Sequence, residues 1–136
     1  MTVFVFDSSA VLRYLDHEAG AERVRAIFRD CADESAEICV SAMQWGEIAA
    51  ILRKRYGAQE QEIRLHRLAQ LNLRIIQINA ECAVRAAAIC VDRKMAFADA
   101  FAVELTLDSP EHVLITADYD FKTVEDLIRI EFLPAK

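Results

Sequence analysis

The chain has 136 residues, of which 54% are hydrophobic and 28% are charged, with only three glycines and two prolines. This composition predicts one packed domain over residues 1–136 and excludes a disordered or low-complexity protein. The net charge of −6 argues against binding nucleic acid by bulk electrostatics alone, although nucleic acid can still be a substrate. No apolar stretch suits a membrane span and no secretory signal is visible, so we expect a cytoplasmic protein.

The first half of the chain alternates between strand and helix patterns. An apolar run predicts a strand at residues 3–6, and apolar residues at helical spacing predict helices at 10–16 and 21–31. A short strand at 38–40 precedes a helix that is capped by Ser41, runs over 42–56 and stops at Gly57.

The second half of the chain continues this alternation. Asn79 is a good cap for one of its helices, and a loop separates the last helix from the strand that follows. The expected elements are a helix at 59–70, a strand at 73–78, helices at 80–93 and 98–107, and strands at 112–116 and 128–133. The alternation predicts an α/β fold, a three-layer α/β/α sandwich with a mostly parallel central sheet.

Asp7 follows the first strand directly and stands before Ser8 and Ser9. Open parallel sheets place their active sites at the carboxyl ends of their strands, so this position favours a functional carboxylate. The alternative is that Asp7 only caps the next helix, although Ser8 or Ser9 could cap that helix instead.

Two further acids lie on helices among apolar neighbours. Glu47 is close to Met43 and Ile51 on the helical wheel, where an ionised carboxylate is costly without a partner. An ion pair with an arginine is the alternative explanation. Asp99 lies in a first helical turn within Phe97-Ala98-Asp99-Ala100, where an acid favoured by the helix dipole is the alternative.

A fourth acid comes just after the strand at 112–116. Asp118 is the first candidate and Asp120 competes with it, and an Asx turn would explain either acid. Thr116 at the strand end has a hydroxyl that can hold a metal-bound water or a neighbouring carboxylate. Four acids at one sheet edge would repel one another unless a hard divalent cation neutralised them.

Four segments of the sequence resemble the PIN-domain ribonucleases, and most closely the VapC-type toxins of bacterial toxin–antitoxin pairs. The segments occur in the family's order and cover essentially the whole chain. They are FVFDSSAVLRYL, SAMQWGEIAAIL, MAFADAFAVEL and VLITADYDF.

The resemblance implies an acidic quartet of Asp7, Glu47, Asp99 and Asp118, with Thr116 beside it. It further implies an endoribonuclease that uses Mg²⁺ or Mn²⁺ to hydrolyse RNA phosphodiesters. Oxygen ligands agree with this choice of metal over zinc, and one or two ions would activate water and stabilise the phosphate. The expected partners are RNA, a cognate antitoxin protein and a second copy of the chain.

Several features depart from the family pattern or stay open. Ala117 stands where the family commonly has glycine, and Asp120 still competes with Asp118. The basic run 53–55, together with Arg13, could meet substrate phosphates or could be a solvated helix end. The residues that could meet an antitoxin, or that could simply belong to the core, are Val11, Leu12, Tyr14, Leu15, Trp45 and Ile51.

Other functions compete with the nuclease. A phospho-acceptor receiver domain needs an Asp after the third strand, where Asn79 stands, and a haloacid-type phosphatase needs an Asp at Ser9. A PIN-like domain that only binds RNA or a protein would be expected to lack one or more acids, and none is missing. A stand-alone RNA-processing nuclease remains an alternative to a toxin.

Overall fold

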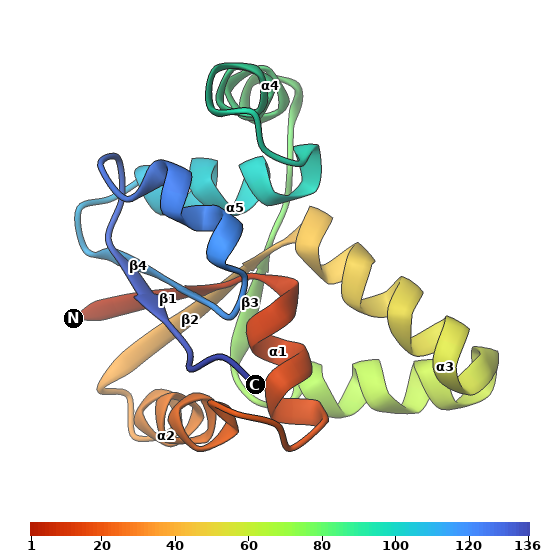
Figure 1. The fold of residues 1–136 in the computed structure, drawn as a ribbon. Helices are drawn as coiled ribbons and strands as arrows, with labels where there is room; N and C mark the ends of the chain where they lie inside the picture. Colours follow the sequence, from red (N-terminus) through yellow and green to blue (C-terminus); the bar gives the residue numbers. More distant parts are fainter.

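The computed structural model describes residues 1–136 and contains a five-stranded sheet in the order β3-β2-β1-β4-β5 (Figure 1). All four strand pairs are parallel. The strands are β1 (Thr2–Phe6), β2 (Ala36–Ser41), β3 (Leu73–Ile76), β4 (His112–Thr116) and β5 (Ile130–Phe132). The prediction of an α/β sandwich is confirmed, and the sheet is wholly parallel.

Helices cover both faces of the sheet, which gives three layers. The first three helices pack on one face, and the last two, with a 3₁₀ helix, pack on the other. The helices are α1 (Ser8–Leu15), α2 (Ala21–Ala32), α3 (Ala42–Ala69), α4 (Ala80–Arg93), α5 (Phe97–Leu107) and the 3₁₀ helix η1 (Tyr119–Val124). None of the helices combines the length and apolar character needed to cross a bilayer.

Alternation along β1 divides the core into two halves. Phe4 and Phe6 pack against α1, α2 and α3, whereas Val3 and Val5 pack against α4, α5 and η1. Successive side chains of a strand point to opposite faces, so a strand buried on both sides is apolar throughout. This is why the first strand reads as an unbroken apolar run.

The helix starts and the break within α3 follow local chemistry. The Ser41 hydroxyl accepts a hydrogen bond from Met43 N, and the side-chain Oδ1 of Asn79 accepts one from Cys82 N, so both predicted caps are confirmed. Gly57 has φ 84° and ψ 173°, a conformation that side-chain-bearing residues rarely adopt. It divides α3 into two helical halves that form an elbow, seen on the right of Figure 1.

Several element boundaries differ from the prediction because strand pairing sets them. The strand expected at 73–78 ends at Ile76, since its partner strand ends at Ser41, which is opposite Ile76. The final strand covers only 130–132, the three residues that face β4. The 3₁₀ helix η1 was not predicted.

Candidate functional site

The order of the strands reverses direction between β1 and β4. From β1 the chain builds outward to β2 and β3, and β4 and β5 are then added on the other side. Ligand sites of open parallel sheets lie outside the carboxyl ends of the strands at such a switch point. In this protein those two ends carry Asp7, after β1, and Thr116 with Asp118, after β4.

Asp7 is 2% exposed and is held by three neighbours. Its carboxylate accepts hydrogen bonds from Ala10 N (3.0 Å), from Thr116 Oγ1 (2.6 Å) and from Ser9 Oγ (2.8 and 2.9 Å to its two oxygens). Burial nevertheless dominates and raises the pKa of Asp7 to about 6. Asp7 itself caps α1, so the suggestion that Ser8 or Ser9 would cap in its place is wrong.

Glu47 extends from α3 toward the N-terminus of α1. Ser8 Oγ donates a 3.3 Å hydrogen bond to its Oε1, and no arginine or lysine forms an ion pair with it. Burial raises the pKa of Glu47, and the Ser8 hydrogen bond offsets only part of this effect. The alternative of an arginine partner is therefore wrong.

Asp99 lies in the first turn of α5 and interacts electrostatically with the other acids. Its pKa is raised to about 6, first by burial and then by the negative charges of Asp118 and Glu47. The charge of Asp99 in turn adds to the raised pKa of Asp7. Asp99 is thus near enough to Asp7, Glu47 and Asp118 for their charges to interact, and Asp7 and Asp118 follow neighbouring strands at one edge of the sheet.

Asp118 and Asp120 have different surroundings. Asp118 is half-buried, its N–H donates to Thr116 Oγ1 (2.9 Å), and its carboxylate caps η1 by accepting from Asp120 N (2.9 Å). Asp120 is exposed and affects the pKa of Asp99 less than Asp118 does. Geometry therefore favours Asp118 as the fourth acid, and the Asx-type turn that was its alternative explanation is also present.

Two polar residues that the sequence did not mark as part of the site, Gln44 and Ser9, connect the acids. Gln44 is fully buried, accepts a hydrogen bond from Ser8 N (2.7 Å) and donates one to Ala98 O (2.8 Å), so it joins α1, α3 and α5. Ser9 Oγ donates to Asp7 and accepts from Ala117 N (2.9 Å). The only sequence signal for Gln44 is its place three residues before Glu47, one turn away on the same helix face.

The chemistry of these groups suits a hard divalent cation. All four acids offer oxygen, and none of them is paired with a lysine or arginine. No three Asp, Glu, His or Cys side chains come close enough together to ligate one ion directly. Mg²⁺ is commonly held through one or two carboxylates while it keeps several waters, so the donor set fits such an ion without a closed cage.

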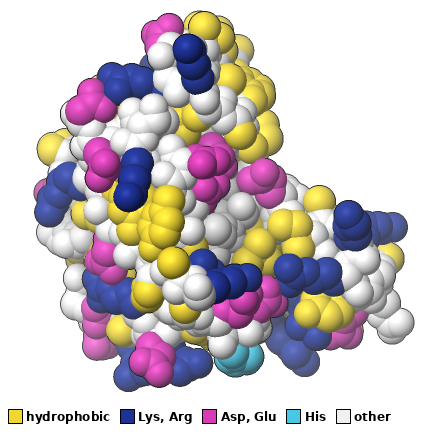
Figure 2. All heavy atoms as spheres, viewed as in Figure 1, with side chains coloured by type: hydrophobic (Ala, Val, Ile, Leu, Met, Phe, Trp, Pro, Cys, Tyr) yellow, Lys and Arg dark blue, Asp and Glu magenta, His cyan; other side chains and the backbone are white.

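Figure 2 shows acidic side chains beside the hollow between the main body and the projecting elbow of α3. Two surface cavities of about 550 Å³ each lie elsewhere and are lined by none of the four acids. The candidate site is therefore separate from these cavities.

The sequence of residues 4–127 matches the model of the PIN domain family, described as "PIN domain". The chain belongs to the PIN domain family. The four segments noted above, at 4–15, 41–52, 95–105 and 113–121, all fall within the matched range. No curated protein sequence matches the chain.

Solved structures share this fold at low sequence identity. VapBC2 from Rickettsia felis, bound to a DNA fragment from its promoter, has a TM-score of 0.70 at 15% identity, covering 98% of this chain and 100% of that one. VapC20 from Mycobacterium tuberculosis, described as a sarcin-ricin loop cleaving toxin, has a TM-score of 0.68 at 19% identity, covering 90% and 95%. VapBC-1 from nontypeable Haemophilus influenzae has a TM-score of 0.60 at 16% identity, covering 96% and 98%.

Proposed function

We propose that this PIN domain is a metal-dependent endoribonuclease and the toxin of a toxin–antitoxin pair. One observation carries the proposal: desolvated carboxylates without cationic partners meet at the switch point of a parallel sheet. Burying several acids together is unfavourable, and here the unfavourable charge is concentrated on the edge where such sheets bind ligands. A divalent cation would offset that charge.

The proposed metal site consists of Asp7, Glu47, Asp99 and Asp118, with Mg²⁺ or Mn²⁺ as the ion, and some of these carboxylates would contact the ion through its bound waters. When bound, the metal would polarise water and stabilise the negative charge that develops on a phosphodiester. Ser9 and Thr116 hold the Asp7 carboxylate in place, because their hydroxyls donate to it. This fixed orientation lowers the reorganisation that the site needs during reaction.

The VapBC structures that share the fold and the partly exposed apolar residues of this chain support the proposed partners. VapBC assemblies share the fold, so we propose a cognate antitoxin, an RNA substrate and a homodimer, acting as one domain in the cytoplasm. Among the apolar candidates for the antitoxin surface, Val11 is fully buried and belongs to the core. The others, Leu12, Tyr14, Leu15, Trp45 and Ile51, are partly exposed.

The test is RNA cleavage by the purified chain. Single-stranded RNA is incubated with wild-type protein and Mn²⁺, with Asp7→Asn protein and Mn²⁺, and with wild-type protein and a chelator. Cleavage only in the first reaction is the expected result. Equal cleavage in all three would point to contamination or to a different site.

Absence of cleavage in all three reactions would favour a PIN domain that binds RNA or protein without catalysis. Co-expression then separates a toxin from a stand-alone RNA-processing nuclease. A toxin should arrest growth when the wild type is expressed and should not do so as Asp7→Asn, whereas a processing nuclease should be tolerated in both forms.

A further inference from the structure

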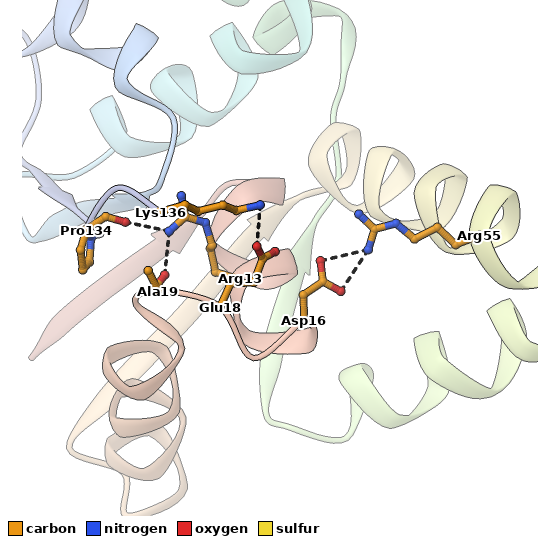
Figure 3. A network of polar contacts seen from close by, with 7 residues as sticks. All are labelled: Arg13, Asp16, Glu18, Ala19, Arg55, Pro134 and Lys136. Atoms are coloured by element: carbon orange, nitrogen blue, oxygen red, sulfur yellow. Dashed lines mark hydrogen bonds and ion pairs between the residues drawn. The ribbon is translucent and has the colours of Figure 1, made fainter.

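A second polar feature adjoins the acidic edge. A groove of about 240 Å³ begins at Ser9 and Ala117, and its walls carry Arg13, Arg55 and Lys136. Ser9 also donates its hydroxyl hydrogen bond to Asp7, so one end of the groove touches the candidate site directly. The three cations come from α1, from the elbow of α3 and from the segment after β5 (Figure 3).

The two arginines are anchored from one side only. Nη1 of Arg55 donates to both carboxylate oxygens of Asp16, at 3.0 Å each. Nη1 of Arg13 donates to Ala19 O and Pro134 O, at 2.7 Å each. None of these hydrogen bonds uses Nε or Nη2, so each guanidinium is held in place with donors left for another acceptor.

Lys136 completes the cluster around a single carboxylate. Its Nζ lies 2.6 Å from Glu18 Oε2, and the pKa of Glu18 is lowered first by this hydrogen bond. Glu18 lines the same groove as Lys136, Arg13 and Arg55, and the charges of all three lower its pKa further. The side chains of Arg55 and Lys136 are 44% and 63% exposed, so a ligand in solvent can reach them.

We propose that this groove binds phosphates of the RNA strand next to the one that is cleaved, with Arg55 and Lys136 as the main contacts. The inference rests on the proposed nuclease function, because that function places the cleaved bond at the acidic edge. The RNA strand would then run from Ser9 along the groove. With a net charge of −6 the chain as a whole repels RNA, so a strand needs a local cationic path to approach four acids. The three cations Arg13, Arg55 and Lys136 outnumber the two acids of the groove, Asp16 and Glu18, and supply that path.

Arg55 and Lys136 are positioning residues in this proposal, because they hold substrate away from the reacting bond. The contact is made equally in the ground state and the transition state. Arg55→Ala should therefore raise KM for RNA cleavage about 5- to 10-fold and leave kcat nearly unchanged. A residue that only stabilised the fold would not raise KM while leaving kcat unchanged.

The decisive experiment measures RNA binding separately from cleavage. A fluorescein-labelled oligouridylate is titrated into Asp99→Asn protein, with and without Arg55→Ala, over a series of salt concentrations. We expect Arg55→Ala to weaken binding about 5- to 10-fold at low salt and to reduce the salt slope of log K by about 0.7, the value for one phosphate contact on a single strand.

Arg85→Ala is the matched control, because Arg85 is also exposed and paired with an acid, Glu104 at 3.1 Å, but lies on α4. Asp16→Asn is the second variant. It removes a negative charge from the groove and releases Arg55, so it should strengthen binding if phosphate is the ligand. Thermal unfolding of every variant shows that it is folded.

Equal affinity and equal salt slope for Arg55→Ala and Arg85→Ala would overturn the proposal, as would weaker binding by Asp16→Asn. The two proposals fail in different ways. If the wild type cleaves RNA with Mn²⁺ and Arg55→Ala changes neither binding nor KM, only the proposal for the groove is refuted. If RNA binding depends on Arg55 but the wild type cleaves no RNA, the nuclease proposal is refuted and the groove remains an RNA-binding site.

Discussion

Asp126 and Asp99 are both aspartates near the surface of the same layer of helices, yet their surroundings affect their charge in opposite ways. Asp126 accepts two hydrogen bonds from Arg93, at 2.7 and 3.1 Å, and these lower its pKa. Asp99 has no cationic partner, and burial together with neighbouring carboxylates raises its pKa to about 6. One acid is stabilised by the fold in its charged form and the other is destabilised.

The same contrast separates two regions of the molecule. Around the outside, acids are neutralised in pairs such as Arg23 with Glu131, at 2.7 Å, and Arg85 with Glu104, at 3.1 Å. At the carboxyl ends of β1 and β4, the carboxylates of Asp7 and Asp118 accept hydrogen bonds from a hydroxyl and from backbone amides, without positive charge. An acidic region that the fold positions but does not neutralise is typical of a site that gains its positive charge from a ligand.

The largest expected effect is on cleavage. Asp99→Asn removes a proposed metal ligand and should lower manganese-dependent RNA cleavage by more than about 100-fold, since the loss of outer-shell partners alone commonly costs 10- to 100-fold. Asp126→Asn removes the same charge from the neutralised region and should cleave at the wild-type rate. Initial rates on one RNA at saturating Mn²⁺ measure both. Similar rates for the two variants would contradict a special function of the acidic edge.

The next effect concerns the neutral residue that joins the acidic edge together. Gln44→Ala leaves Ser8 N without its partner, removes the side-chain hydrogen bond to Ala98 O and opens a cavity, so it should reduce the free energy of unfolding by about 3 kcal/mol. Gln61→Ala, on the second half of α3, removes a 2.8 Å hydrogen bond to Ala49 O and a 3.3 Å hydrogen bond from Arg53 Nη1 at a half-buried site, and should cost about 1 kcal/mol. Urea unfolding curves compare the two. Equal losses would show that Gln44 is not a structural link.

Much of the fold was predictable because its signals are local. Each signal determines the structure of only the few residues around it, and each was confirmed. These signals are the apolar run of β1, the Ser41 and Asn79 caps and the break at Gly57. The 3₁₀ helix η1 has no such signal. It forms because Phe121 and Val124 are buried against the sheet and α5, which depends on contacts distant in sequence.

The position of the candidate site could be predicted from the sequence, but the hydrogen bonds that link its residues could not. A carboxylate after an apolar strand and a carboxylate on an apolar helix face are visible as residues that do not fit their surroundings, which applies to Asp7 and Glu47. A buried glutamine such as Gln44 looks like an ordinary helix residue until the helices are packed. That Asp7 both caps α1 and faces the acids also follows only from the three-dimensional structure.

A divalent cation should stabilise the acidic edge in a pH-dependent way. At a metal concentration about 100-fold above Kd, Mn²⁺ should add about 2.7 kcal/mol to the free energy of unfolding at pH 8. Protons compete with the metal for Asp7 and Asp99, whose pKa values are both about 6, so the gain should shrink as pH falls through about 6. Thermal unfolding with and without Mn²⁺ measures this, with Asp99→Asn as the control. A gain that does not depend on pH would place the metal elsewhere.

The smallest effect gives the clearest contrast, because its sign differs between the two regions. An acid whose pKa is raised by folding stabilises the protein at low pH, and that contribution is lost as pH rises through about 6. Without metal at pH 8, Asp99→Asn should therefore increase the free energy of unfolding, by roughly 1 kcal/mol after allowance for solvent screening. Asp126 has a lowered pKa, so its charge stabilises the fold above its unfolded pKa and Asp126→Asn should leave stability unchanged or slightly reduced. Chemical unfolding in the presence of a chelator compares the two variants. If both shift stability in the same direction, the acids at the edge of the sheet are balanced by the protein itself, and the reason to place a cation there disappears.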